Sequence, residues 1–260
     1  MKHVTWEHDN VRQTWQALPV RKPFIYGQTN YIAATLSANV LLAAGAVTAI
    51  GAIPSAVEIF ASNADAIWIN AAAQVTDPPE QLFAAARIAQ DKNIPWVLDP
   101  VAMGAGAETY DNVIRQLLTY RPAVIRGNAS ELMALAGGAG GTKGVEATLS
   151  PAAALAAARD LARRSGAVVA ISGPVDHITD GTSVRLVPGG SPMLTRITGA
   201  GCSLGALVAA LLRVAATPLE AATVAHAAYA IAAEQAAERA RGPASFTMEF
   251  VDALSCLADN

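Results

Sequence analysis

The sequence has few cysteines, few aromatic residues and little charge. Only two of its 260 residues are cysteines, Cys202 and Cys256, so it offers neither a disulfide framework nor a cysteine spacing that binds metal. Aromatic residues make up 5% of the chain and charged residues 15%, with a net charge of −3. Because no Lys/Arg cluster extends beyond Arg163-Arg164, nucleic acid is not an expected partner.

Long uninterrupted apolar runs are also absent, since Gly, Arg or Pro breaks each of them, so no membrane span is predicted. The first fifteen residues lack the apolar core of a signal peptide, and we expect a cytoplasmic protein. Hydrophobic residues make up 53% of the chain, an apolar excess that is due mostly to alanine, which excludes disorder and suits a single domain over residues 1–260. So much alanine with so little charge also favours a homo-oligomer that covers apolar surface.

Short apolar runs alternate with helical stretches along most of the chain. Strands are predicted at Ala66–Asn70, Pro95–Pro100, Ala123–Ile125 and Ala167–Ile171, with a β-hairpin over Val175–Pro188 that turns at Asp180-Gly181. Helices are predicted at 78–92, 110–120, 129–136, 151–165, 203–215, 218–240 and 246–257. This pattern predicts an α/β fold, with a mostly parallel sheet covered by helices on both faces and the hairpin at its edge. The stretch Gly137–Gly144 reads as the most flexible.

Polar residues follow or end four of the predicted strands, namely Asn70, Asp99, Arg126-Gly127-Asn128 and Ser172-Gly173. Ligands of such sheets bind beyond the carboxyl ends of the strands, so these residues and the nearby Glu131 should face one cleft. Carboxylates suit Mg²⁺, and arginine suits phosphate.

Structural alternatives exist for four of these residues. Asp99 before Pro100 could serve only as a turn former, and Arg126 could form only a surface ion pair. Asn128 and Glu131 have the spacing of a helix capping box. Each alternative is reasonable alone, but all of them together at one edge of a sheet are much less expected.

The run Thr198-Gly199-Ala200-Gly201-Cys202 stands directly before a helical apolar stretch. Glycines let a backbone approach a ligand closely, and a helix that opens after them directs free N–H groups at the ligand. Such a helix mouth binds anions, most often phosphate. The alternative is a glycine-rich turn with a cysteine that only packs. The helix mouth lowers the thiol pKa and nearby phosphates raise it, so the sequence leaves the charge of Cys202 open.

Several motifs together resemble one known family. They are Thr29-Asn30, Ala38-Asn39, Leu41–Ala46, Val97–Val101, Val124–Glu131, Lys143-Gly144-Val145, Ser172–Gly181, Thr198–Cys202 and Gly242–Phe246. The chain resembles the hydroxyethylthiazole kinases, thiamin-salvage enzymes with the ribokinase-like three-layer fold. The resemblance covers about Pro23 to Leu257, and its two most specific blocks are Arg126–Glu131 and Thr198–Cys202.

The resemblance implies an ATP-dependent transferase that uses Mg²⁺ and phosphorylates the primary hydroxyl of 5-(2-hydroxyethyl)-4-methylthiazole. It also implies a trimer whose active sites are shared between subunits. On the nucleotide side, the resemblance implies that ATP is bound by Arg126, Ser172 and Asn128, and that Asp99 and Glu131 lie near the metal and the phosphates. On the acceptor side, it implies contacts from Gly199, Asn30 and Ile50, with Cys202 beside the acceptor hydroxyl. The transferring phosphoryl group is then held by the N–H groups of Gly199, Ala200 and Gly201.

The N-terminal third departs from the family pattern. Thr48 and Ile50 stand where the family has Pro and a substrate-contacting Met, and Ala72-Ala73-Gln74 replaces a Gly-Thr-Leu. These changes affect the acceptor side of the site and leave the phosphoryl-transfer side matched. Two alternatives therefore stay open: a kinase for another small hydroxyalkyl heterocycle, pyrimidine- or pyridoxal-like, and a nucleotide- or thiazole-binding relative without turnover.

Overall fold

The computed structural model describes residues 1–51, 53–137 and 150–258. The strands of these residues form one sheet in the order β1-β9-β8-β7-β6-β5-β4-β2-β3. Their bounds are β1 Lys2–His3, β2 Phe24–Gln28, β3 Val47–Ile50, β4 Ala66–Asn70, β5 Trp96–Asp99, β6 Val124–Asn128, β7 Val168–Ser172, β8 Val175–Thr179 and β9 Val184–Pro188. Neighbouring strands are parallel except where β8 pairs with β7 and β9.

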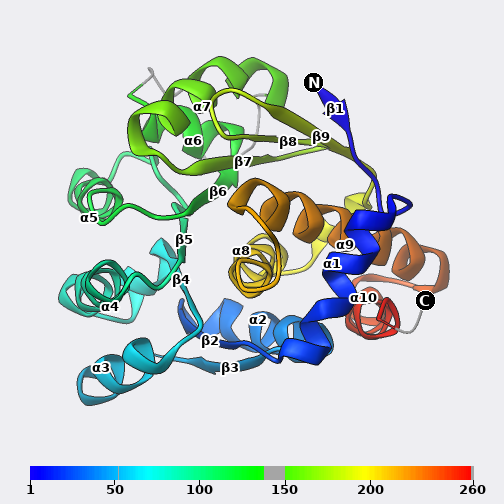
Figure 1. The fold of residues 1–260 in the computed structure, drawn as a ribbon, viewed down its shortest axis with the longest axis horizontal. Coiled ribbons are helices and arrows are strands. Elements are labelled where there is room, and N and C mark those ends of the chain that lie inside the picture. The colour runs from blue at the N-terminus through cyan, green and yellow to red at the C-terminus, as the bar shows by residue number, and fades with distance from the viewer. Residues whose placement is uncertain (52, 138–149, 259–260) are drawn as a thin grey trace.

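Helices cover both faces of the sheet, which gives the three layers visible in Figure 1. The helices are α1 Asp9–Arg21, α2 Tyr31–Ala43, α3 Pro54–Asn63, α4 Pro79–Lys92, α5 Glu108–Leu118, α6 Ala129–Leu135, α7 Pro151–Ser165, α8 Ala200–Leu211, α9 Pro218–Arg239 and α10 Pro243–Cys256. One core lies between the sheet and α1, α2, α8, α9 and α10, and a second lies between the sheet and α3 to α7. None of the helices in the described residues is both long and apolar enough to cross a bilayer.

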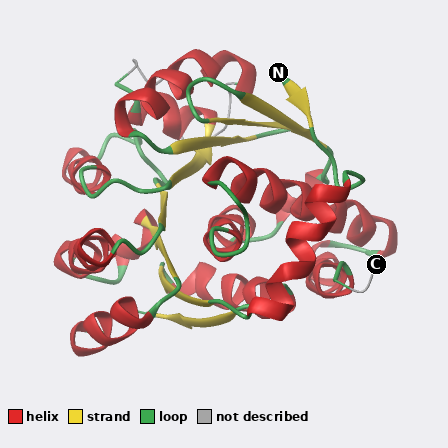
Figure 2. Ribbon diagram, viewed as in Figure 1, coloured by secondary structure: helices red, strands yellow, loops and turns green. Residues whose placement is uncertain are grey.

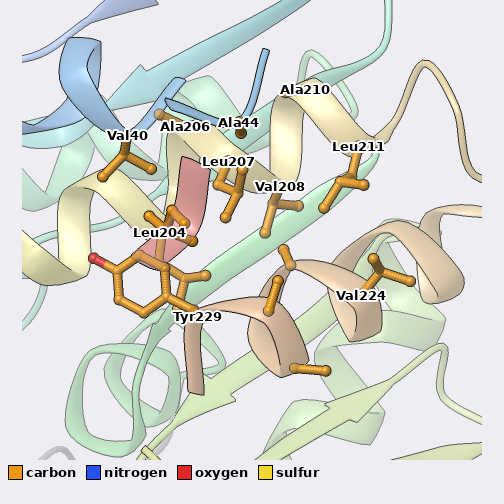
Figure 3. Packing of buried hydrophobic residues seen from close by; sticks show 14 of the residues in the cluster. Val40, Ala44, Leu204, Ala206, Leu207, Val208, Ala210, Leu211, Val224 and Tyr229 are labelled. Atoms are coloured by element: carbon orange, nitrogen blue, oxygen red, sulfur yellow. The ribbon is translucent and has the colours of Figure 1, made fainter. Parts of the chain in front are cut away.

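Helix α8 runs through the middle of the first core, against the sheet and against α2 and α9. Ten of its twelve residues are buried, which explains why its sequence is apolar on every side. In Figure 3, Leu204 of α8 lies next to Tyr229 of α9, and Val40 of α2 lies near the same end of α8. Leu211, at the other end of α8, lies nearer Val224 of α9. This packing fixes the N-terminus of α8 relative to the sheet.

The predicted α/β architecture is confirmed, and strands and helices alternate along the chain from β4 to β7. Figure 2 shows the strands in yellow with helices in red on both sides of them. Strand β6 continues to Asn128, beyond the predicted Ala123–Ile125, because Arg126 and Gly127 stay paired with β7. Helix α8 begins at Ala200, three residues earlier than predicted, because Gly199 adopts a left-handed φ of 84° and caps it. Of the stretch Gly137–Gly144, only Gly137 lies within the described residues.

The hairpin of β8 and β9 is confirmed, but it does not form the outermost edge. Lys2 and His3 pair with Arg185 and Leu186, so the two-residue β1 lies outside the hairpin. The elements from α1 to α3 had no sequence prediction. Strand β2 pairs with β3 on one side and β4 on the other. After the edge strand β3, the chain therefore passes β2 and continues across the sheet in the opposite direction, from β4 to β9.

Candidate functional site

Four polar side chains share one face of the sheet at the carboxyl ends of β4 to β7. The residues two positions earlier, on the same face, are Trp68, Val97, Val124 and Ala170, and all four lie in the first core, under α8 and α9. The polar residues that continue this face are Asn70, Asp99, Arg126 and Ser172. Each strand thus changes from apolar to polar where it leaves this core, and the expected clustering at one sheet edge is observed.

Arg126 occupies the centre of this cluster. Its Nε and Nη2 donate to Ser172 Oγ at 3.1 and 2.7 Å, and its Nη1 donates to the Gly201 carbonyl at 2.9 Å. Nη1 also lies 3.6 Å from Asp99 Oδ2. The side chain is almost fully buried, so the alternative of a surface ion pair is wrong. Burial lowers the pKa of Arg126, but the nearby Asp99 and Glu131 carboxylates raise it, and the guanidinium stays charged.

Asp99 is fully buried, and neither of its carboxylate oxygens has a hydrogen-bond partner among the described residues. Burial raises its pKa to about 7, while Arg126 lowers it. The alternative that Asp99 is a turn former is not supported, because its side chain accepts no backbone hydrogen bond there. Buried polar atoms in proteins are nearly always paired. Asp99 therefore has the properties of a group whose partner is a ligand, as do the unpaired Trp68 Nε1 and Asn70 Nδ2 next to it.

Glu131 forms the capping box of α6. Its Oε2 accepts from the Asn128 N–H at 2.9 Å, while Asn128 Oδ1 accepts from the Glu131 N–H at 3.0 Å. Glu131 Oε1 accepts from the Ala102 N–H at 3.1 Å. The capping alternative is thus confirmed, although each carboxylate oxygen keeps a second lone pair. Burial raises the pKa of Glu131, and Glu131 in turn raises the pKa of Asp99, so the two carboxyl groups are close enough to interact.

The N-terminus of α8 has no side-chain cap, because its capping residue is Gly199. The N–H groups of Ala200, Gly201 and Cys202 belong to the first turn and have no intrahelical acceptor. A Cβ on Gly199 would lie 3.3 Å from Ala33 Cα of α2, which shows how closely the two helices approach. Open N–H groups next to a buried arginine form an anion-binding arrangement.

The Cys202 thiol lies within this first turn and is partly buried. Burial and the Asp99 carboxylate raise its pKa to about 12, against smaller opposing effects of Arg126 and Asn70. The thiol is therefore protonated near neutral pH, which decides the charge that the sequence left open. In this state Cys202 offers a hydrogen bond rather than a basic thiolate.

Asn30 and Ile50, two of the three residues expected to contact the acceptor, differ in their surroundings. Asn30 Oδ1 accepts from the Ala33 N–H at 2.9 Å and so caps α2. Ile50 is aligned with Gly27 of β2, which in turn is aligned with Trp68 of β4. A Cβ on Gly27 would lie 3.3 Å from Ile50 Cγ1 and 3.0 Å from Trp68 Cε3. Ile50 and Trp68 therefore meet over Gly27, next to the polar cluster.

The other residues that depart from the family pattern, Thr48 and Ala72-Ala73-Gln74, lie in different surroundings. Thr48 Oγ1 donates to the Ile25 carbonyl and is thus engaged within the sheet. Ala72 and Ala73 are buried in a short 3-10 helix, and Gln74 Nε2 donates to the Tyr110 carbonyl.

Sequence reasoning missed Trp68 and Gly205. A Cβ on Gly205 would lie 2.8 Å from Trp68 Nε1 and 3.0 Å from Asp99 Oδ2, so this glycine lets both groups approach α8. The signals were present: Trp68 precedes Asn70 by two residues on a strand, and Gly205 follows Gly201 by one helical turn.

A cavity of about 280 Å³ lies elsewhere, between β1, α1 and α9. It is lined by residues such as Lys2, Arg185 and Thr217, near the amino end of β9, and by none of the polar cluster. We take the polar cluster as the candidate site because its unpaired buried atoms call for a ligand.

Known proteins resemble this chain in sequence and in fold. Residues 16–260 match the model of the hydroxyethylthiazole kinase family. A hydroxyethylthiazole kinase from Burkholderia pseudomallei (strain 668) is 56% identical over 257 residues, which cover 99% of this chain and 93% of the relative.

Two solved structures show the same fold. A hydroxyethylthiazole kinase from Pyrococcus horikoshii OT3 superposes with a TM-score of 0.85 at 31% identity, covering 95% of this chain and 93% of the other. A ribokinase-like superfamily protein from Enterococcus faecalis V583 is 13% identical with a TM-score of 0.69 and covers 100% of this chain and 97% of the other. The second likeness concerns the fold alone and confirms the ribokinase-like architecture.

Proposed function

Because this chain belongs to the hydroxyethylthiazole kinase family, we propose that it transfers the terminal phosphoryl group of ATP to the primary hydroxyl of 5-(2-hydroxyethyl)-4-methylthiazole, a step of thiamin salvage. One observation carries the proposal. Arg126, the buried Asp99 carboxylate 3.6 Å from it and the uncapped N-terminus of α8 meet at a single sheet edge. Phosphoryl transfer depends mainly on positioning and charge stabilisation, and these groups provide both.

In this proposal Arg126 pairs with the phosphates, and Ser172 holds its guanidinium in place. The three N–H groups at the start of α8 donate to the phosphoryl oxygens as charge develops on them. Asn128 lies next to Ser172 on the neighbouring strand and contributes to the ATP side. Rigid donors are effective here because they need no reorganisation during the transfer.

The residues present fit a magnesium ion. Both Asp99 oxygens lack a hydrogen-bond partner among the described residues, although Oδ2 lies 3.6 Å from Arg126 Nη1, and Glu131 has one remaining lone pair on each oxygen. Among the described residues no three acidic, histidine or cysteine side chains gather to bind a metal by themselves. This agrees with Mg²⁺, which proteins hold through one or two carboxylates together with substrate phosphates and water. When bound, Mg²⁺ would neutralise phosphate charge, with Asp99 as its main ligand and Glu131 beside it.

On the acceptor side, Cys202 orients the substrate hydroxyl as a neutral hydrogen-bond partner. Its raised pKa argues against removal of the hydroxyl proton by a thiolate. Ile50 and the Gly199 backbone border the heterocycle, and Asn30 stands at the start of α2 beside them. Ile50 lacks the flexible thioether of the family's methionine, so we propose weaker or broader thiazole recognition.

We further propose that the chain works in the cytoplasm, as a single domain and as a trimer. Support for assembly comes from large apolar side chains that are exposed around the start of α2 and on α3, namely Tyr31, Ile32, Ile53, Ile59 and Phe60. Exposed apolar residues in such number mark an interaction surface. Tyr31 and Ile53 lie just beyond the carboxyl ends of β2 and β3, so a neighbouring subunit there would border the acceptor side.

The test is ADP formation from MgATP with a panel of acceptors: the thiazole alcohol, a hydroxymethylpyrimidine and pyridoxal. We expect thiazole-dependent ADP formation with a higher kcat/KM than for either of the others. Turnover of the pyrimidine or pyridoxal alone would keep the kinase chemistry and replace the acceptor. No acceptor-dependent ADP formation with any of the three would refute the proposed reaction.

A further inference from the structure

A buried histidine and aspartate pair lies behind the phosphate side of the candidate site. His226 of α9 is completely buried, and its Nδ1 lies 2.7 Å from Asp176 Oδ2 of β8. Because an ionised carboxylate only accepts hydrogen bonds, Nδ1 carries the hydrogen. His226 Nε2 has no partner among the described residues, so the contact with Asp176 is the polar interaction that orients the ring.

Asp176 also holds the turn that follows β7. Its Oδ1 accepts from the Gly173 N–H at 2.8 Å. Gly173 has no room to shift toward α7, because a Cβ there would collide with Pro151, the first residue of that helix. Asp176 thus ties the turn to α9 on one side, and Pro151 limits the turn on the other.

The residue before this turn is Ser172, which receives two hydrogen bonds from Arg126. The contacts therefore run without a break from His226 through Asp176 and Gly173 to Ser172 and Arg126. Asp176 also acts on Arg126 directly, since it is among the negative charges that raise the pKa of the guanidinium. A change at His226 should reach the phosphate-binding arginine through these few contacts.

We propose that Asp176 and His226 are positioning residues for the nucleotide: they fix the turn after β7 and so hold Ser172 and Arg126 in the orientation that binds the phosphates. This inference rests on the proposed function, in which Arg126 and Ser172 bind ATP. It assigns no role to the pair in acceptor binding. Loss of the pair should therefore weaken nucleotide binding selectively.

Two matched variants separate this role from simple packing. His226→Asn places an amide donor near the position of Nδ1, whereas His226→Gln places it near Nε2, which has no partner. We expect His226→Gln to raise the KM for ATP about tenfold, which corresponds to the loss of one charge-assisted hydrogen bond. The KM for ATP of His226→Asn should stay close to that of the wild type, because its amide keeps this hydrogen bond. The thiazole KM should change less than about twofold in both variants.

Asp176→Asn keeps the size of the side chain and an acceptor for Gly173 but removes the charge. Asp176→Asn should also weaken ATP binding, and it supplies a second measurement where His226→Gln fails to fold. Thr179→Val is the stability control, because Thr179 Oγ1 holds the turn at the other end of β8 through Ser183 and Gly181. We expect it to lower the melting temperature and leave the KM for ATP unchanged.

Calorimetric titration with magnesium and a non-hydrolysable ATP analogue gives a readout that needs no acceptor. Weaker analogue binding in His226→Gln and Asp176→Asn supports the inference even if the thiazole proves not to be the acceptor. Unchanged analogue binding in both, with a loss of stability like that of Thr179→Val, would overturn it. Equal effects of His226→Asn and His226→Gln would also contradict it, since the donor position would then be irrelevant.

Discussion

At the scale of single residues, the buried Cys202 thiol gives the most direct prediction. With a pKa of about 12, the thiol is neutral over the ordinary working range, so no thiolate contributes to the rate near pH 8. Cys202→Ser keeps a neutral hydroxyl donor and acceptor and should retain kcat within about tenfold. Cys202→Ala should lose more, with the KM for ATP nearly unchanged in both.

The measurement is kcat from pH 6 to about 10 for the three proteins. A wild-type rate that rises through pH 8–9, with the rise absent in Cys202→Ser, would show that a thiolate takes part. Alkylation by iodoacetamide is an independent check, because a protonated, buried thiol reacts slowly. Cys202 should react far more slowly than the exposed Cys256 in the same protein.

Asp99 predicts a pH-dependent stability. Its folded pKa of about 7 lies above the ordinary value of 3.8, so the folded state binds the extra proton between these values. Stability contributed by this group is therefore full below about pH 4 and declines as the pH rises to about 7. Asp99→Asn removes this titration and should also abolish turnover.

The melting temperature of Asp99→Asn minus that of the wild type should therefore increase from about pH 4 to about pH 7 and then level off. Asp99→Asn also leaves Arg126 without its carboxylate, which shifts the melting temperature by the same amount at every pH. The test is therefore how the difference in melting temperature changes with pH, not its absolute size. A difference that stays flat across this range would mean that Asp99 titrates at its ordinary value in the folded protein.

At the scale of elements, the capping box of α6 separates two roles of Glu131. Glu131→Gln keeps one amide oxygen that can accept from the Asn128 N–H and loses the charge, whereas Glu131→Ala loses the side-chain acceptor of the cap as well. We expect Glu131→Ala to lower the free energy of unfolding by about 1 kcal/mol and Glu131→Gln to lower it much less. Urea unfolding measures this difference.

The kinase rate then tests the metal role. If Glu131 acts on magnesium, both variants should need more Mg²⁺ for half-maximal rate, although only one loses stability. A Glu131→Gln enzyme with an unchanged Mg²⁺ requirement would leave Glu131 with its capping role alone.

The role of the N-terminus of α8 in catalysis can be tested by alanine substitution at two matched glycines. Gly199 and Gly166 both have left-handed backbones, with φ of 84° and 75°. Alanine at either position should cost about 1–2 kcal/mol of stability. Only Gly199→Ala brings a Cβ to 3.3 Å from Ala33 at the site, while Gly166 has open space around it.

We therefore expect Gly199→Ala to reduce kcat/KM for the acceptor and Gly166→Ala to leave it unchanged at equal stability loss. Steady-state kinetics below the melting temperature of both variants measure this. Equal kinetic effects would mean that general loosening, rather than the helix mouth, controls the rate.

At the scale of the whole molecule, the exposed apolar residues of α2 and α3 predict self-association. The wild type should have a mass in solution of three times the 26.7 kDa chain. Ile53 is 70% exposed and stands at the uncapped start of α3, so Ile53→Asp adds a helix cap while it places charge on this surface. We expect the variant to fold and to dissociate.

Light scattering after size exclusion measures the mass of each protein. Val20→Asp is the matched control, because Val20 is 84% exposed on α1 and outside the proposed surface. An assembly that survives Ile53→Asp but is lost in Val20→Asp would show that the interface includes α1 and not the proposed surface on α2 and α3.

The sequence predicted the β4 to β9 half of the fold well because strands and helices there are short, regular and separated by clear turns. The first 65 residues gave no such signal: α2 has apolar residues on all sides, and β3 is only four residues long. The site was predictable where polar residues end strands, as at Asp99 and Arg126. The contribution of Trp68 and the protonation of Cys202 were not, since both depend on packing between distant segments.

The alternation of side chains along β4 to β7 has a consequence for how this family can change in evolution. Insertion of one residue within any of these strands would turn its polar terminal residue to the opposite face and place an apolar one in the site. Length changes should therefore accumulate in the connections at the amino ends of the strands, such as those around Asp65 and Ala123. New acceptor preferences would instead arise by substitution at fixed positions, such as that of Ile50 beside the polar cluster.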